Sequence, residues 1–513
     1  MGEPASHRHG DGDRDRILLV NPAMTKHPRF PLSILSLAAA LDGQHDYLMI
    51  DGNVDRQFIV SSLSALEHDV YDAVGISVMG GPQLGPAIKL SQAIKQHHPK
   101  LPLVWGGYFP TLYPEATIKA DYVDLLIRGP GEKTLLELLA RFRGGNEPDL
   151  STIGGLTWKK NGVPVHNEGR PLSDAMDLGP LPYHRLGKPD RYIGPSFLGN
   201  RTSLYQGALG CRFRCTFCGV AAMFKGGTRL PAAERLEEDL RVLKVRYGVD
   251  SIQFCDHNFF DREDSMMPIL QVLARLQLPW WCYARADALL GLSNEGWRLV
   301  QKSHLKMAYI GAESPNDRIL RDVRKGTRAD QTMAVAELCR AKGVIPEFSF
   351  MVAPPEDPAG ETERTFEFIR QIKKINPAAE IIIYIYTPIP GSQSAANMGP
   401  RSKDMAPLLD SAGLPIQFPA TPDEWAEPRW IRYACHADAP WVSPRLRRRI
   451  NDFSRVLECR FPTVQDHKTP RWGKSMLSLL SSWRYAMGRY DHPWELGLAR
   501  NLIRLREPAK VSL

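Results

Sequence analysis

Two runs of alternating strands and helices constrain the fold of this chain more than any other feature of its sequence. In the first run, apolar segments near 17–21, 47–51, 73–78, 103–106 and 123–128 alternate with helical stretches near 32–41, 57–66, 84–97, 114–119 and 132–143. Short continuous apolar strands between amphipathic helices are typical of a parallel sheet that is covered on both faces. The pattern therefore predicts an α/β, doubly wound, Rossmann-like domain over residues 17–145.

The second run predicts a barrel. Its apolar strands lie near 204–207, 251–256, 280–285, 307–311, 347–351 and 381–387, with helices near 232–247, 265–276, 294–303, 329–342 and 361–375. Six strand-helix units in succession predict a partial (β/α)6 barrel of the TIM type over residues 201–393, with reacting groups at the carboxyl ends of its strands.

The segments outside these two runs are less regular. Residues 1–16 lack the apolar stretch of a secretory signal, and we expect a disordered leader there. Residues 146–200 are predicted to form a linker that contains a hairpin around Asn161-Gly162. No apolar run is long enough to cross a membrane. The 8 cysteines are too scattered for a disulfide framework, so we expect a protein of the reducing cytoplasm.

Three cysteines follow the first strand of the second run. Cys211, Cys215 and Cys218 have the spacing C-x3-C-x2-C on one short loop. Three thiolates on one loop can hold three corners of a [4Fe-4S] cluster. A structural zinc site would need a fourth Cys or His, and none follows closely. The alternatives are a zinc clip and three unrelated cysteines.

Glycine and polar residues gather where the strands of the first run end. Doubly wound sheets bind ligands beyond the carboxyl ends of their strands, and glycine there lets a large flat ligand approach the backbone. No G-x-G-x-x-G follows the first strand, which argues against a dinucleotide. The candidate ligand-binding residues are Asp51, Ser77, Gly80, Gly81, Gln83, Gly106, Gly107, Tyr108, Gly129 and Glu132.

Three segments at these strand ends resemble the cobalamin-binding domain found in front of many radical SAM enzymes. They are GISVMGGPQ from residue 75, VWGGYFPTLYPE from residue 104 and LLIRGPGEKTLLELL from residue 125. The resemblance implies that cobalamin binds at the ten residues named above. A nucleotide-binding or degenerate structural domain is the alternative. Some cobalamin proteins carry D-x-H-x-x-G at the position of residues 51–56, but this segment has no histidine. The resemblance therefore implies that no protein imidazole binds the cobalt. We assign the loop 79–84 to the lower face of the cobalt.

The cysteine motif and four later segments resemble the radical SAM superfamily. These segments are residues 251–256, 311–314, 325–327 and 386–392. The resemblance implies that S-adenosylmethionine (SAM) binds the open iron of the cluster and is cleaved to a 5′-deoxyadenosyl radical. With the cobalamin-like domain, it points to a class B radical SAM methyltransferase that uses methylcobalamin to methylate an unactivated carbon.

The resemblance also suggests roles for residues at the strand ends of the second run. Phe217, Asp256, Arg285, Glu313 and Ser314 are the candidates for SAM binding, and His257, Tyr384 and Tyr386 for the catalytic or substrate cavity. Each has a structural alternative. Glu313 and Ser314 could cap a strand, Arg285 could form a salt bridge, the Asp256-His257 pair could be a hydrogen-bonded structural element, and the tyrosines could simply pack. Cys255 and Cys282 are expected to be core residues.

The expected reaction is methyl transfer to a small-molecule or lipid-like intermediate, with electrons from an external flavodoxin or ferredoxin type donor. Two alternatives stay open. One is oxidative cyclisation or ring rearrangement by the same architecture, as in the anaerobic porphyrin-ester cyclases that the chain also resembles. The other is a non-catalytic cobalamin or redox sensor.

The C-terminal region, 394–513, is basic and rich in tryptophan. Residues 441–513 hold 15 Lys+Arg against 6 Asp+Glu, and six of the 11 tryptophans follow residue 420. This composition fits a small helical domain packed on the barrel, a lid over its mouth, or a surface for peripheral association with a membrane. No recognised motif accompanies the charge, so nucleic acid is not expected as a partner.

Overall fold

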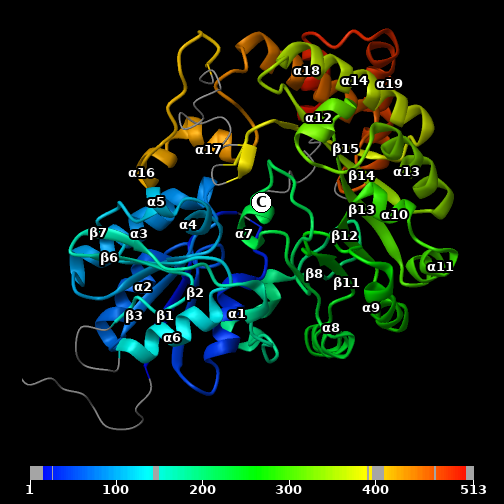
Figure 1. Ribbon diagram of the computed structural model, residues 1–513. Coiled ribbons are helices and arrows are strands. Elements are labelled where there is room, and N and C mark those ends of the chain that lie inside the picture. The colour runs from blue at the N-terminus through cyan, green and yellow to red at the C-terminus, as the bar shows by residue number, and fades with distance from the viewer. Residues whose placement is uncertain are drawn as a thin grey trace, which may run out of the picture. The chain divides into compact units, whose positions relative to one another are not determined.

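The computed structural model describes residues 15–25, 27–142, 149–389, 392–394, 409–466 and 469–503. The predicted leader therefore lies almost entirely outside the described residues. The chain divides into two compact units, Met1–Lys188 and Pro189–Leu513 (Figure 1). Each unit contains one of the two predicted sheets.

The first unit is built on a seven-stranded sheet with the order β2-β1-β3-β4-β5-β6-β7. The strands are β1 (Arg16–Asn21), β2 (Asp46–Asp51), β3 (Ala73–Ser77), β4 (Leu103–Gly106), β5 (Leu125–Ile127), β6 (Leu156–Lys160) and β7 (Val163–His166). The first five pair in parallel, as the sequence predicted. The order reverses between β1 and β3, which is the switch point where such sheets bind ligands.

Helices cover both faces of this sheet. They are α1 (Leu32–Leu41), α2 (Phe58–His68), the 3-10 turn η1 (Gly81–Gln83), α3 (Leu84–His97), α4 (Tyr108–Leu112), α5 (Pro114–Thr117) and α6 (Glu132–Phe142). Helix α1 contacts α6 and α2 contacts α3, which gives one helix layer on each face. Strand β1 is buried between the layers from Ile17 to Val20, as its continuous apolar run predicts.

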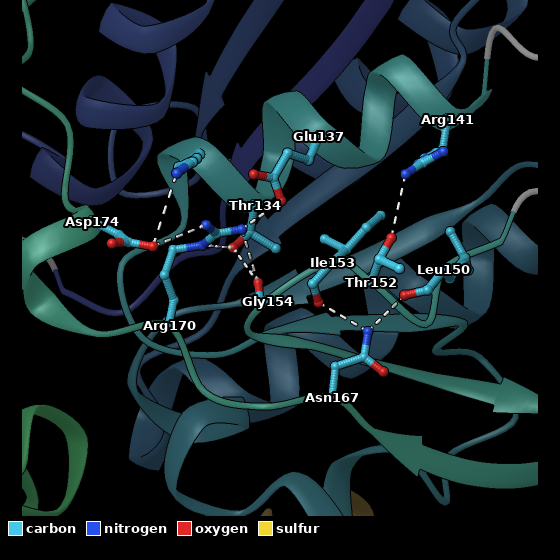
Figure 2. A network of polar contacts seen from close by, with 11 residues as sticks. Thr134, Glu137, Arg141, Leu150, Thr152, Ile153, Gly154, Asn167, Arg170 and Asp174 are labelled. Carbon is cyan, nitrogen blue, oxygen red and sulfur yellow. Dashed lines mark hydrogen bonds and ion pairs between the residues drawn. The ribbon is translucent and has the colours of Figure 1, made fainter.

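The predicted hairpin forms, and it is part of the first sheet. Strand β6 pairs antiparallel with β5 and then with β7. Arg170, just beyond the hairpin, is almost fully buried and donates hydrogen bonds to Thr134 Oγ1 (3.0 Å), Glu137 Oε2 (2.5 Å) and the Gly154 carbonyl (3.2 Å) (Figure 2). Charge-assisted bonds to a buried guanidinium are strong, so they fasten this part of the predicted linker to α6. Three 3-10 turns follow: η2 (Leu172–Asp174), η3 (Tyr183–Leu186) and η4 (Pro189–Tyr192).

The second unit is built on a six-stranded, wholly parallel sheet with the order β15-β14-β13-β12-β11-β8. Its strands are β8 (Thr202–Tyr205), β11 (Ser251–Phe254), β12 (Trp280–Ala284), β13 (Leu305–Glu313), β14 (Ile345–Val352) and β15 (Glu380–Ile385). All six predicted strands are present, in sequential order across the sheet. Sequential parallel strands with helices between them are the arrangement of a partial (β/α)6 barrel (Figure 1).

The helices of the barrel alternate with its strands. They are α7 (Gly219–Phe224), α8 (Ala233–Tyr247), α9 (Glu263–Leu276), α10 (Ala286–Leu290), α11 (Asn294–Lys302), α12 (Asp317–Asp322), α13 (Ala329–Lys342) and α14 (Pro358–Ile375). A two-stranded ribbon of β9 (Leu209–Gly210) and β10 (Thr228–Arg229) closes the segment that contains the cysteine motif.

The C-terminal region is helical, as predicted. It contains α16 (Pro422–Trp425), α17 (Pro428–Ala434), α18 (Pro444–Arg460), α19 (Arg471–Met487) and α20 (Trp494–Ile503). Trp425, Trp430 and Trp441 are buried in an aromatic cluster with Tyr433. The described residues include no helix that is both long and apolar enough to cross a membrane.

Candidate functional site

The carboxyl edge of the first sheet has a glycine-rich backbone. Gly80, Gly107 and Gly129 all have φ between +75° and +102°, a conformation that side chains rarely tolerate. At Gly107 a Cβ would also lie only 3.0 Å from the carbonyl oxygen of Val78. Gly129 has open space where its Cβ would be. This edge therefore presents bare backbone at the switch point, which suits the close approach of a large flat ligand such as a corrin.

The polar side chains predicted at this edge are largely engaged with one another. Asp51 Oδ1 accepts hydrogen bonds from Asn21 Nδ2 (2.8 Å) and from the backbone N–H of Asn53 (3.0 Å). Gln83 is buried, and its Nε2 donates to Asn21 Oδ1 (3.0 Å). Sequence reasoning assigned Asp51 and Gln83 to the ligand, which stays a prediction, and the structure shows that both also connect the ends of β1, β2 and β3.

The remaining predicted cobalamin residues line the same edge. Ser77 Oγ lies 2.8 Å from Ser33 Oγ of α1. Tyr108 and Glu132 begin α4 and α6, each directly after the loop that leaves a strand. Met79, in the loop assigned to the lower side of cobalt, is 40% exposed, and its N–H donates to Gln83 Oε1 (2.6 Å).

The cysteine loop lies between β9 and α7 in the second unit. The N–H of Thr216 donates to the Val323 carbonyl (2.9 Å), and the Thr216 carbonyl and hydroxyl both accept hydrogen bonds from Ser394. Arg212 pairs with Asp261 (2.7 Å). These contacts hold the loop to distant parts of the same unit, so the three thiols are positioned by tertiary structure and not by the motif alone.

The three thiols suit a cluster better than a single metal ion. Among the described residues, no group of three His, Cys, Asp or Glu side chains converges as the ligands of one ion. A structural zinc ion takes four ligands, whereas three thiolates can each bind a different iron of a [4Fe-4S] cluster. The donor set therefore fits a cluster with one iron left open for SAM.

Burial favours the protonated thiols of Cys211 and Cys218. Burial raises the pKa of Cys218 to about 11, although backbone N–H groups of Val220 and Ala221 at the start of α7 act in the opposite direction. Burial also raises the pKa of Cys211. Because metal ligation needs thiolates, cluster binding must displace protons at this loop.

Arg285 lies against the cysteine loop. Its guanidinium carbon is 3.6 Å from the centre of the Phe213 ring, and its Nη2 donates to the Lys325 carbonyl (2.7 Å). It also forms a salt bridge with Asp287 (2.9 Å). The structural alternative considered for Arg285 is thus present, and the cation-π contact makes this side chain a support for the loop. Phe217, the other aromatic of the loop, is half-buried.

Glu313 and Lys325 form a buried ion pair beside Arg285. The Nζ to Oε1 distance is 2.8 Å, and both side chains are nearly inaccessible to solvent. Glu313 follows an irregularity in the pairing of β13 with β14 and has a left-handed backbone, with φ of +62°. Burial alone would lower the pKa of Lys325, but Glu313 and Cys215 raise it, and the net shift is upward. Lys325 belongs to a segment that carried the family resemblance, yet sequence reasoning gave it no role.

Ser314 and Asp256 support neighbouring backbone. Ser314 Oγ accepts a hydrogen bond from the N–H of Asn316 (3.0 Å). Asp256, at the end of β11, accepts one from the N–H of Gly207 (2.7 Å), just before the cysteine loop. Burial raises the pKa of Asp256 to about 7, although the N–H groups of Ala208 and Gly207 oppose that shift. Asp256 therefore positions the approach to the cysteine loop.

His257 and Asn258 follow Asp256 and have unsatisfied polar atoms. Within the described residues, Nδ1 of His257 and both amide atoms of Asn258 are buried without a hydrogen-bond partner. Burial lowers the pKa of His257 to about 4, so its ring is neutral near pH 7. Buried polar groups in native proteins normally find partners, so these atoms suit a polar ligand such as SAM at the carboxyl end of β11. Sequence reasoning missed Asn258, and its place beside the Asp256-His257 pair was the only signal.

The interior of the barrel is lined by tyrosines. Tyr283, Tyr309 and Tyr384 come from β12, β13 and β15, and the Tyr283 and Tyr309 rings lie 5.0 Å apart. Burial raises the pKa of Tyr384 above its usual value, and the carboxylates of Glu347 and Glu313 add to this shift, although the hydrogen bond with Tyr309 acts in the opposite direction. Tyr386 lies one residue beyond β15 and hydrogen-bonds with Ser394. The two predicted tyrosines therefore have different surroundings, because the strand ends at Ile385.

The two cysteines assigned to the core are within the barrel sheet region. Cys282 is fully buried, and burial raises its pKa well above the usual range. Cys255 is half-buried directly after β11. Neither belongs to a metal-binding group in the described part of the chain.

Comparison with family models matches both units. Residues 23–139 match the B12 binding domain, and residues 205–369 match the radical SAM superfamily. These ranges coincide with the glycine-rich sheet and with the barrel.

Several curated proteins resemble the chain over both regions. An uncharacterized methyltransferase of Pyrococcus horikoshii is 26% identical, covering 71% of this chain and 77% of its own length. The hopanoid C-3 methylase of Methylococcus capsulatus is 26% identical, covering 71% and 68%. The anaerobic magnesium-protoporphyrin IX monomethyl ester cyclase of Synechocystis is 22% identical, covering 64% and 67%.

A solved structure shares the architecture of the whole chain. The radical SAM methyltransferase TsrM of Kitasatospora setae, determined with cobalamin and a [4Fe-4S] cluster bound, aligns with a TM-score of 0.67. It is 16% identical and covers 96% of this chain and 99% of its own. The chain therefore combines a region that matches the radical SAM superfamily with an N-terminal region that matches the B12 binding domain, and it shares its fold with the radical SAM methyltransferase TsrM.

Proposed function

We propose that this protein is a cobalamin-dependent radical SAM methyltransferase that transfers a methyl group to an unactivated carbon of a small-molecule or lipid-like intermediate. One observation carries the proposal: a single chain has both a cysteine loop suited to a SAM-binding cluster and a sheet edge suited to a corrin. When bound, the cluster and SAM supply a radical that removes hydrogen, and cobalamin supplies a carrier for the methyl group.

The residues of the chain have distinct parts in this proposal. Cys211, Cys215 and Cys218 hold the cluster, and Arg285 supports their loop through Phe213. His257 and Asn258 offer unsatisfied polar atoms to SAM. Tyr384 remains protonated, because burial raises its pKa, and it can donate a hydrogen bond within the barrel. The cluster residues are the only ones whose removal should abolish every reaction.

The proposed partners follow from the chemistry. Reductive cleavage of SAM needs an electron, which we assign to a flavodoxin or ferredoxin type donor. A lipid-like substrate and the basic, tryptophan-rich C-terminal region together suggest peripheral association with a membrane.

The test uses the full chain, reconstituted anaerobically with iron, sulfide and cobalamin, then supplied with dithionite and SAM that carries a deuterated methyl group. We expect label in the cobalamin fraction and production of 5′-deoxyadenosine, both measured by mass spectrometry. Cys218→Ala should lose the iron-sulfur absorbance and both products. Cys435→Ala removes an exposed cysteine outside the loop and should behave like the wild type.

Two results would contradict methyl transfer. If 5′-deoxyadenosine forms but no label leaves SAM, the cyclisation or rearrangement alternative is favoured, and the match to the cyclase gives that alternative a specific basis. If neither product forms while the cluster and cobalamin are both bound, the protein acts as a sensor.

A further inference from the structure

Helices α19 and α20 expose a row of large apolar side chains on the second unit. We call this surface the α19–α20 face. Its nine residues are between 38% and 84% exposed: Trp472, Met476, Leu479, Leu480, Trp483, Met487, Trp494, Leu498 and Leu502. Single exposed apolar residues are ordinary, but nine large ones on two neighbouring helices are characteristic of a surface that binds a partner.

The spacing of these residues shows that the face is a property of the helices and not of a frayed end. On α19 they recur at intervals of three and four from Trp472 to Met487, and on α20 at intervals of four from Trp494 to Leu502. Such spacing places each set along one side of its helix. The face therefore consists of one exposed apolar stripe on each of two neighbouring helices.

The opposite sides of both helices are already packed. Gly473, Leu477 and Ser481 of α19 are buried, and α18 and α19 lie side by side (Figure 1). A Cβ at Gly473 would clash with Ile503 at the end of α20, so the two helices are in close contact. Because the inner sides of the helices pack against the core of the unit, their exposed apolar sides are available to a binding partner.

The charges around the face favour an anionic partner. The acidic residues between Pro470 and Ile503 are Asp491 and Glu495, which form ion pairs with Arg449 and Arg484. Arg471 and Arg489, at the two ends of α19, are exposed. Residues 470–503 hold five Lys+Arg, at positions 471, 474, 484, 489 and 500, against these two carboxylates, so the apolar face lies in a segment with an excess of positive charge.

We infer that the α19–α20 face binds the surface of a bilayer that contains anionic phospholipids, which deepens and rests on the membrane association proposed above. The three tryptophans suit the boundary between headgroups and acyl chains, and the leucines and methionines suit the region beneath it. Basic side chains add attraction to anionic lipid that salt weakens. A second copy of the chain is a poorer occupant, because it would bring two positively charged regions together.

The test measures binding of the full, cofactor-reconstituted chain to lipid vesicles. Flotation with phosphatidylcholine vesicles is compared with flotation of vesicles that also contain phosphatidylglycerol, at low and high salt. We expect binding to the anionic vesicles, weakening with salt, and a blue shift of tryptophan fluorescence. Leu479→Ser with Trp483→Ser should weaken binding by roughly tenfold or more, since each removes a large side chain from the lipid.

Val245→Ser is the matched control, because Val245 is 83% exposed on α8 and outside the face. It should bind like the wild type. The variant Leu479→Ser with Trp483→Ser should lose vesicle binding but keep its circular dichroism spectrum. It should also still transfer label from SAM to cobalamin. Those two readouts separate failure of this inference from failure of the proposed function.

Three outcomes would overturn the inference. The first is that the wild type fails to bind anionic vesicles, or that the face variant binds them as well as the wild type does. The second is a concentration-dependent dimer in sedimentation velocity that the face variant abolishes, which would identify a second copy as the occupant. The third is lipid binding that appears only when residues 504–513 are deleted, which would mean that this segment covers the face.

Discussion

Glu347 provides a quantitative test of how burial inside the second unit changes the pKa of a carboxyl group. This carboxyl group lies on β14 and is almost fully buried. It accepts a hydrogen bond from Trp281 Nε1 (3.0 Å) and another from Gln465 Nε2. Burial, reinforced by the nearby Glu380, raises its pKa from 4.5 to about 7, although the two hydrogen bonds act in the opposite direction.

The sign of the effect on stability follows from this shift. A carboxyl group whose pKa is higher in the folded state binds its proton more tightly there than in the unfolded chain. Its stabilising contribution is present below pH 4.5 and is lost as the pH rises through 7. A shift of this size corresponds to about 3 kcal/mol, because each pKa unit is worth roughly 1.4 kcal/mol.

Glu347→Gln should remove this pH dependence. The amide can still accept from Trp281, and the Gln465 amide can rotate to donate or accept as required. At pH 5 the variant should unfold close to the wild type, and at pH 8 it should be about 3 kcal/mol more stable. For a unit that runs from Pro189 to Leu513, this corresponds to a rise in melting temperature of about 5 °C.

The assay is calorimetry or circular dichroism of the full chain from pH 5 to pH 8, following the transition of the second unit. Glu238→Gln, which changes an exposed carboxyl group on α8, is the control and should leave the pH profile unaltered. A difference between Glu347→Gln and the wild type that stays constant across this range would refute the reasoning. So would a variant that is less stable than the wild type at pH 8.

Two further perturbations test the supports of the two cofactor regions. Lys325→Met leaves the Glu313 carboxylate buried without its partner and should lower the free energy of unfolding of the second unit by about 3–5 kcal/mol. The double variant, Lys325→Met with Glu313→Gln, should recover part of that loss in the same thermal assay. A double variant no more stable than the single one would show that the pair is not energetically coupled. Gly107→Ala places a Cβ on a backbone with positive φ, 3.0 Å from the carbonyl oxygen of Val78. We expect a lower melting temperature of the first unit and weaker cobalamin binding, which absorbance spectroscopy would measure. Gly85→Ala, on α3 with open space around its Cβ, is the matched control and should be tolerated.

Both sheets could be predicted because their signals are local. The continuous apolar runs from Ile17 and from Trp280 mark strands buried on both faces, and the intervening periodic helices require parallel connections. The cysteine motif could be recognised equally well, since its three cysteines lie within eight residues. Chemistry that is concentrated in a short segment can be recognised without knowing the fold.

The roles of individual polar residues were harder to predict, because a side chain's partners come from distant segments. Asp256 was expected to contact SAM, which stays a prediction, and only the structure shows that it also accepts a hydrogen bond from the backbone of Gly207, which is 49 residues earlier in the sequence. Lys325 could be recognised as part of a family segment, yet only the fold brings it to Glu313 in a buried pair. Sequence reasoning placed Asp256 and Glu313 at strand ends correctly, but it could not say which groups each side chain contacts.

The sequence by itself determined the two α/β regions through their periodicity and the cysteine motif through its spacing, because each signal lies within short segments, and the cofactors followed from the resemblance of those segments to known families. Only the tertiary structure decided which tryptophans of the C-terminal region are buried and which are exposed. Trp425, Trp430 and Trp441 form a core, whereas Trp472, Trp483 and Trp494 lie on an open helix face. The physical reason is that burial depends on which helix side meets a neighbour, and an amphipathic pattern does not reveal whether its apolar side is covered by protein or by something else.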